Sequence, residues 1–287
     1  MSDFLSRNEL VHDLFVRTAD ENYITARWCY ENQLRLDFSW LAVHCLEKYM
    51  KAVLLLNGHS AKENGHDVRQ LFVKVSEFAN DLLPERLEKP IYLRDNWFHT
   101  TTSSFIDHIY RQGNADNRYL IYGYTTRFQD LFMLDMLVFA IRRLARPLNE
   151  RYLPGYIPCD QTNRDWLLNK LNWKVSLNLP LEKALRLPIA SERKRALFNH
   201  NYPFAPIDYV HEPMAAGSQS RTPVILRRVL EPLASSDSKV LKEAIKTAKW
   251  LLENVVLPGG GNDNKRKLLA GEIEEAIKSA ELKLNDQ

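Results

Sequence analysis

The sequence predicts an all-α protein in which an antiparallel helical bundle precedes a C-terminal helical region. Three observations lead to this prediction. Apolar residues recur at helical spacing through most of the chain, and several such stretches begin with a residue that commonly caps helices. No pair of alternating stretches flanks an Asn-Gly or Asp-Gly turn, which is the usual sign of a β-hairpin.

The first two predicted helices lie before residue 58. Asp20 is expected to cap a helix over about 21–35, and Asp37 or Ser39 is expected to begin the next one. The second helix should stop at Asn57-Gly58, because glycine readily adopts the left-handed conformation past a helix end.

Three more helices are expected before residue 147. Asp67 is a suitable cap for the third, and a fourth with weaker periodicity spans about 95–110. The stretch 113–123 is expected to be a loop. Thr126 then caps a long apolar helix that reaches about residue 146.

A domain boundary is expected directly after this helix. Pro147, Pro154, Gly155 and Pro158 give the stretch a linker composition, so we expect a bundle over 1–146 and a helical region of unknown type over 147–287. The helices expected in the second region are at about 163–171, 181–186 and 191–199, from Thr222-Pro223, from Ser236 or Asp237, and at 263–284.

The composition favours a cytoplasmic protein. Of 287 residues, 45% are hydrophobic and 26% are charged, which is typical of a globular protein. No apolar run approaches the roughly 18–20 residues that span a bilayer, and the polar start does not resemble a signal peptide, so we expect no membrane association. The three cysteines form no Cys-x-x-Cys pair, which favours reduced thiols.

Positive charge gathers in the second half of the chain. Residues 1–150 hold 18 Lys and Arg against 20 Asp and Glu, whereas residues 151–287 hold 21 against 16. Such an excess can attract phosphates, but it is also what an ordinary solvated surface shows.

The common motifs for cofactor and metal binding are absent. The sequence contains no P-loop, dinucleotide fingerprint, His-Glu-x-x-His or Gly-x-Ser-x-Gly elbow. The histidines are not spaced as zinc ligands, so we expect neither a metal nor a cofactor.

Three short pieces of the first half carry a family resemblance. They are Glu47-Lys48-x-x-Lys51-Ala52 in the second predicted helix, Gly65-His66-Asp67 before the third, and Asn117-Arg118-Tyr119 in the following loop. Together they resemble the HEPN family, the helical nucleotide-binding domains of higher eukaryotes and prokaryotes, over about residues 20–146. The resemblance implies a homodimer that acts on RNA or nucleotides.

The same resemblance suggests which residues bind a nucleotide or RNA: Glu47, Lys48, Lys51, His66 and Arg118. The alternative is structural, since Glu47 and Lys51 have the i, i+4 spacing of a helix ion pair, and His66 and Asp67 stand where a helix cap would.

Many HEPN members are metal-independent ribonucleases with an Arg-x4–6-His motif. The histidine serves as base or acid, and the arginine neutralises phosphate charge. Arg94 and His99 are our catalytic candidates, because this pair lies inside the matched region and an Asp follows the Arg. The other pairs with this spacing are Arg7/His12, Arg193/His200 and Arg195/His200.

One departure from the family pattern favours a different function. The last predicted helix of the bundle, from Arg127, contains no His, although the family's motif usually lies there. The alternative is therefore a non-catalytic nucleotide- or partner-binding module, for example one paired with a nucleotidyltransferase antitoxin. A toxin or phage-defence setting is implied by the resemblance alone.

Two further features have a structural and a functional interpretation. Asp130 and Asp135 lie on the long apolar helix, where they either face solvent, form salt bridges or belong to a site. Residues 197–214 combine aromatics with two histidines, which suits either nucleotide stacking or a loop packed over helices.

Overall fold

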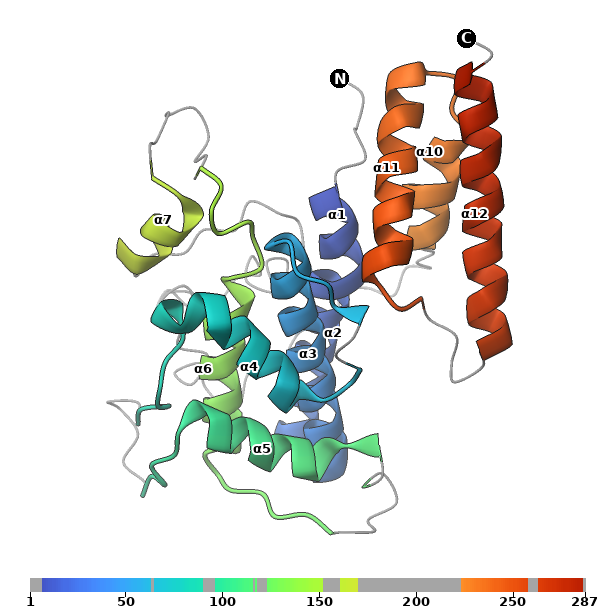
Figure 1. The fold of residues 1–287 in the computed structure, drawn as a ribbon. Coiled ribbons are helices and arrows are strands. Elements are labelled where there is room, and N and C mark those ends of the chain that lie inside the picture. Colours follow the sequence, from blue (N-terminus) through green and yellow to red (C-terminus); the bar gives the residue numbers. More distant parts are fainter. Residues whose placement is uncertain are drawn as a thin grey trace, which may run out of the picture. The chain divides into compact units, whose positions relative to one another are not determined.

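Figure 1 shows the computed structural model of the chain, whose regular elements within the described residues are all helices. The structure describes residues 7–62, 65–89, 96–115, 117, 123–151, 161–169, 223–257 and 263–285. In these ranges, β-structure is limited to two isolated bridges, Arg86 with Thr101 and Arg151 with Thr162. The prediction of an all-α fold is therefore confirmed.

The chain divides into two compact units. The first, which we call the bundle unit, comprises Phe15–Asn57 and His66–His211. The second, the terminal unit, comprises Met1–Leu14, Gly58–Gly65 and Glu212–Gln287. The terminal unit thus combines both ends of the chain with a short internal segment from its first quarter.

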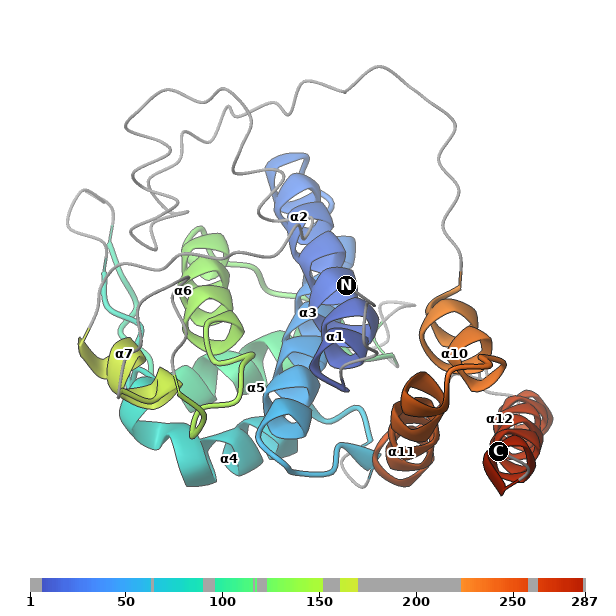
Figure 2. The same ribbon diagram turned by 90° about the horizontal axis from the view of Figure 1, so that it is seen from above.

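Helix α3 lies at the centre of the bundle unit and packs against α2, α4, α5 and α6 (Figures 1 and 2). Because neighbours surround it, α3 buries residues on several faces and is apolar around most of its circumference. Among the described residues, the helices of this unit are α2 (Arg17–Glu31), α3 (Arg35–Leu56), α4 (Val68–Ala79), the 3-10 turn η3 (Asn80–Leu82), α5 (Thr102–Gly113), α6 (Asp130–Arg142) and α7 (Asn163–Asn169).

The backbone at the end of α5 packs directly against the backbone of α3. A Cβ atom on Gly113 would lie 2.1 Å from the carbonyl oxygen of Ser39, which is far inside van der Waals contact. Glycine is therefore required here by the space between the two helices.

A buried ion pair joins α2 to α6. The guanidinium of Arg142 donates from Nε and Nη2 to the carboxylate of Asp20 at 2.7 and 2.8 Å, and the Tyr49 hydroxyl donates to the same carboxylate at 2.6 Å. Asp20 lies inside α2, which begins at Arg17, so the prediction that it caps a helix is wrong. Its charge is used in tertiary packing.

A second buried pair joins the same two helices. The Asp135 carboxylate accepts hydrogen bonds from Arg27 and from the hydroxyl of Tyr23, the latter at 2.5 Å. Burial raises the pKa of Asp135, and Arg27 opposes that rise. Of the alternatives open for Asp135, the structure shows the salt bridge.

Two predicted helix ends in this unit are confirmed. The Asp67 side chain accepts the backbone N–H of Arg69 at 2.9 Å, which caps α4. Helix α3 ends before Asn57, and Gly58 follows with φ of 82°.

Three other predicted helix starts differ from the structure by a few residues. Helix α3 begins at Arg35 rather than at Asp37 or Ser39, and α5 begins at Thr102 with Thr101 as its cap rather than near residue 95. Helix α6 begins at Asp130, four residues after Thr126.

The terminal unit is a helical assembly with α11 and α12 running antiparallel (Figure 1). Asp237 caps α11 by accepting from the backbone N–H groups of Lys239 and Val240, as expected for that residue. The elements are α1 (Arg7–Val11), which continues into the π-helical turn η1 (His12–Val16), the π-helical turn η6 (Leu226–Leu230), α10 (Glu231–Leu233), α11 (Ser238–Asn254) and α12 (Asp263–Asn285).

An acidic residue ties the start of the chain to the C-terminal helices of this unit. Both Arg227 and Arg228 donate to the Asp13 carboxylate, at 2.7 and 2.8 Å, and Arg228 also contacts Glu9 at 2.9 Å. The helices predicted at 181–186 and 191–199 and the cap Thr222 lie outside the described residues.

None of the helices in the described ranges has the length and apolar character that crossing a membrane would require.

Candidate functional site

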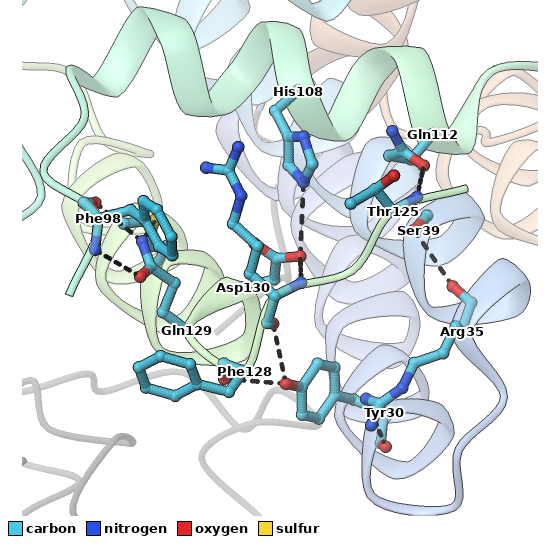
Figure 3. Close-up of polar contacts among 12 residues, drawn as sticks. Tyr30, Arg35, Ser39, Phe98, His108, Gln112, Thr125, Phe128, Gln129 and Asp130 are labelled. Carbon is cyan, nitrogen blue, oxygen red and sulfur yellow. Dashed lines mark hydrogen bonds and ion pairs between the residues drawn. The ribbon is translucent and has the colours of Figure 1, made fainter. Parts of the chain in front are cut away.

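The N-terminus of α6 gathers polar and aromatic side chains from three parts of the bundle unit (Figure 3). They come from the end of α2 and the start of α3, from α5 and the segment before it, and from the turn that leads into α6. We call this group the α6 face. Its members are Tyr30, Arg35, Phe98, His108, Gln112, Thr125, Arg127, Phe128, Gln129 and Asp130.

A histidine and a carboxylate meet at the centre of the α6 face. His108 Nε2 lies 3.4 Å from Oδ2 of Asp130, a long hydrogen bond. Asp130 is buried, and the side chain of His108 is 17% exposed. The same carboxylate oxygen accepts the backbone N–H of Arg127 at 2.7 Å.

Asp130 is oriented by the start of its own helix. Asp130 is the first residue of α6, and its side chain reaches back three positions to the backbone N–H of Arg127 in the turn before the helix. This contact fixes the carboxylate, and the carboxylate in turn fixes one nitrogen of His108. When Nε2 carries the proton towards Asp130, Nδ1 is the basic nitrogen.

The α6 face also contains two contacts between a cation and an aromatic ring. The Arg127 guanidinium lies 5.1 Å from the centroid of the Phe98 ring, and that of Arg35 lies 3.9 Å from the centroid of Tyr30. The Tyr30 hydroxyl donates to the backbone carbonyl of Phe128 at 2.8 Å, which ties the end of α2 to the turn before α6. Burial raises the pKa of Tyr30, so its hydroxyl remains a donor at neutral pH.

Two glutamines hold the flanking backbone segments. The buried amide of Gln129 accepts from the N–H of Phe98 and donates to its carbonyl, both at 2.8 Å. The Oε1 atom of Gln112 accepts the N–H of Thr125 at 2.8 Å. Both contacts are visible in Figure 3.

Comparison with known protein families finds one match in the first part of the chain. Residues 12–113 match the HEPN domain family. This part of the chain is a HEPN domain. Neither the curated proteins nor the solved structures include a match to the chain.

The HEPN match ends at the last residue of α5. His108 therefore lies inside the matched range, whereas Arg127 and Asp130 lie beyond it, in the next helix and the turn before it. The α6 face is thus built jointly by the HEPN domain and by α6.

The catalytic pair predicted from the sequence is only partly visible. Arg94 lies outside the described residues, as does Arg118. His99 is exposed and directly follows Phe98, on the segment that Gln129 holds. The segment that carries His99 therefore borders the α6 face. The aromatic stretch 197–214 also lies outside the described residues.

The binding residues predicted in α3 and before α4 of the HEPN domain form a second group. Glu47 is buried and accepts from Lys51 Nζ at 2.7 Å, and His66 Nδ1 lies 2.9 Å from the same oxygen. His66 itself is 81% exposed at its side chain. The structure thus brings these three predicted residues together around one carboxylate.

The Lys48 side chain contacts α2 rather than Glu47. Its Nζ donates to Oδ1 of Asn22 at 2.6 Å, and burial lowers its pKa. No group of three or more His, Cys, Asp or Glu side chains arranged to hold a metal ion occurs among the residues that the structure describes.

Sequence reasoning missed His108 and Arg127 as site residues and left the role of Asp130 open. The family motif has an Arg followed by a His four to six residues later, whereas His108 precedes Arg127 in the chain. One signal was available. Asp130 is an acidic residue at the start of an apolar helix, where a carboxylate can accept hydrogen bonds from free backbone N–H groups.

Proposed function

We propose that the HEPN domain and α6 form a metal-independent endoribonuclease that acts at the α6 face. The observation that carries this proposal is the contact between His108 and Asp130, whose carboxylate also accepts the backbone N–H of Arg127. Membership of the HEPN family supports a role on RNA or nucleotides. A histidine held by a carboxylate, with an arginine beside it, suits phosphodiester chemistry.

The reaction needs a base, an acid and a cation. His108 takes the proton of the ribose 2′-hydroxyl, and the 2′-oxygen attacks the adjacent phosphorus. The bond from phosphorus to the 5′-oxygen breaks, and that oxygen takes up a proton from an acid. Arg127 stabilises the negative charge that develops on the phosphoryl oxygens. The products are a 2′,3′-cyclic phosphate and a 5′-hydroxyl end, and the nucleophile belongs to the substrate.

Arg94 and His99 remain the second candidate pair for this chemistry. His99 is exposed on the segment next to Phe98, so it is a candidate for the acid that protonates the leaving oxygen. His108 is the stronger candidate for the base, because a general base works best when another group orients it.

The test is cleavage of a fluorescent single-stranded RNA by the purified protein in excess EDTA. We expect His108→Gln to lower the rate about 10²- to 10⁴-fold with unchanged far-UV circular dichroism, and the products to carry 2′,3′-cyclic phosphates. His99→Gln serves as the comparison. Loss of cleavage in His99→Gln alone would transfer the role of base to His99.

A second candidate function is nucleotide binding without cleavage. The described helix α6 (Asp130–Arg142) carries no His, and this departure from the usual HEPN nuclease pattern favours it. Calorimetric titration with ATP, GTP and nucleoside monophosphates tests this version. Heat of binding together with intact RNA would support it over the nuclease.

The HEPN resemblance also supports a homodimer, a protein partner such as a nucleotidyltransferase antitoxin, and a toxin or phage-defence role in the cytoplasm. Sedimentation equilibrium tests the dimer. A monomer at micromolar concentration would contradict that part of the proposal.

A further inference from the structure

Phe98 presents its ring to solvent from an ordered backbone. Phe98 is 60% exposed, although its backbone N–H and carbonyl are both hydrogen-bonded to the buried side-chain amide of Gln129. The neighbouring Trp97 indole donates to the carbonyl of Leu87 at 3.1 Å. The exposure of the ring is therefore built into the structure.

The same segment is held on its other side as well. The N–H of Leu87 donates to the carbonyl of Thr100, and the N–H of Thr102 donates to the carbonyl of Glu85 at 2.9 Å. Segment 96–100 is thus fixed between the 85–87 stretch and Gln129. Little conformational entropy remains to be lost when a ligand binds to the Phe98 ring.

A cation and a second ring accompany Phe98. Arg127 is exposed and its guanidinium lies 5.1 Å from the Phe98 ring centroid. Phe128 is 39% exposed, and Figure 3 shows Phe98 and Phe128 on either side of Gln129. A flat ligand that carries negative charge, such as a nucleobase attached to phosphate, matches a ring with an adjacent guanidinium.

We propose that Phe98 is a stacking platform for an unpaired base, so that the substrate of the α6 face is single-stranded RNA. This inference rests on the proposed function and names its substrate class. In a duplex each base is stacked and paired, and its faces are not available to a protein ring. An unpaired base next to the cleaved phosphate can lie on Phe98 while Arg127 contacts the phosphate. Gln129 is the positioning residue that holds the platform.

The experiment measures the affinity of the full chain for a labelled single-stranded RNA and for the same RNA in a duplex. A His108→Gln background prevents turnover. We expect Phe98→Ala to lower the single-strand affinity about 5- to 150-fold and to change the duplex affinity less than twofold. Trp28→Ala is the matched control, because Trp28 is a similarly exposed aromatic (56%) on α2.

An RNA series with one abasic nucleotide moved along the strand locates the stacked base. When the abasic nucleotide stands where the stacked base would be, the RNA should bind to the His108→Gln parent as weakly as intact RNA binds to Phe98→Ala. The loss of affinity from the abasic nucleotide and the loss from Phe98→Ala should not add. Gln129→Glu can accept from the N–H of Phe98 but cannot donate to its carbonyl. This variant should lose less affinity for single-stranded RNA than Phe98→Ala does.

The two proposals fail differently. Equal affinity of Phe98→Ala and the parent for single strands would overturn the stacking platform, whether or not the wild type cleaves RNA. Tight, Phe98-dependent binding by a protein that cleaves no RNA would support the platform and overturn the nuclease. The absence of any RNA binding would overturn both.

Discussion

Arg142 donates two parallel hydrogen bonds to the carboxylate of Asp20, and both side chains are buried between α2 and α6. The pair determines how α6 lies against the bundle, and the α6 face depends on that placement. Because a buried charge without its partner is strongly unfavourable, the bundle is expected to be sensitive to single substitutions in this pair.

Arg142→Met should lower the free energy of unfolding by about 3–5 kcal/mol, since the Asp20 charge would lose its guanidinium. Urea denaturation followed by circular dichroism measures this. The double variant Asp20→Asn with Arg142→Met removes both charges and should recover part of the loss. A double variant less stable than Arg142→Met would contradict the explanation.

Gly113→Ala should destabilise the bundle because its Cβ would lie 2.1 Å from the backbone oxygen of Ser39. Overpacking of this kind costs about 1–3 kcal/mol. Gly271→Ala is the matched control, since a Cβ there meets nothing within 4 Å and alanine favours helices. Thermal unfolding should show a lower transition for the first variant only.

The cap of α4 predicts a pH dependence. The hydrogen bond from Arg69 holds the pKa of Asp67 below its usual range, so the native state favours the carboxylate. Its contribution to stability is fully present above the unfolded pKa of about 3.9 and is lost as the pH falls through the lower pKa of the folded state. Asp67→Asn keeps a capping oxygen but does not titrate.

We therefore expect wild type to exceed Asp67→Asn in stability at pH 7 and the difference to shrink between pH 4 and pH 2. Asp67→Ala, which removes the cap, should lose about 0.5–2 kcal/mol at neutral pH. Urea titrations at several pH values measure these differences. A difference that stays constant with pH would show that the carboxylate is not the titrating group.

Arg127→Met tests the phosphate contact of the α6 face. Each phosphate contact with a single strand contributes about 0.7 to the slope of log affinity against log salt concentration. The variant should bind RNA more weakly and show a slope smaller by about that amount. Arg111→Met is the control, because Arg111 is an exposed α5 residue paired with Asp107. An unchanged slope for Arg127→Met would show that Arg127 does not contact a phosphate.

For the group around Glu47, substitutions can distinguish a role in stability from a role in RNA binding. Glu47→Gln should lower stability by about 1–3 kcal/mol, because the largely buried ammonium of Lys51 loses its carboxylate. Lys51→Met tests the proposed nucleotide contact, which predicts a loss of RNA affinity. If affinity stays within twofold of wild type, Lys51 acts in packing alone.

Local features of the sequence were sufficient for much of the fold. The helical periodicity, the caps Asp67 and Asp237 and the stop at Asn57-Gly58 depend on neighbours within a few residues, and the structure has them as expected. The same locality explains the recognition of the HEPN domain, whose Glu47-Lys48 and His66-Asp67 pieces are contiguous in the chain.

Only the tertiary structure decided the partners of the buried charges and the composition of the α6 face. Asp20 is a common capping residue and stands before a stretch with helical periodicity, yet it pairs with Arg142, 122 residues later. His108 meets Asp130, and Gln129 meets Phe98, because the packing of α5 and α6 around α3 brings them together. Periodicity specifies which face of a helix is apolar, but the choice of partner for a polar side chain is made when helices pack and water is excluded.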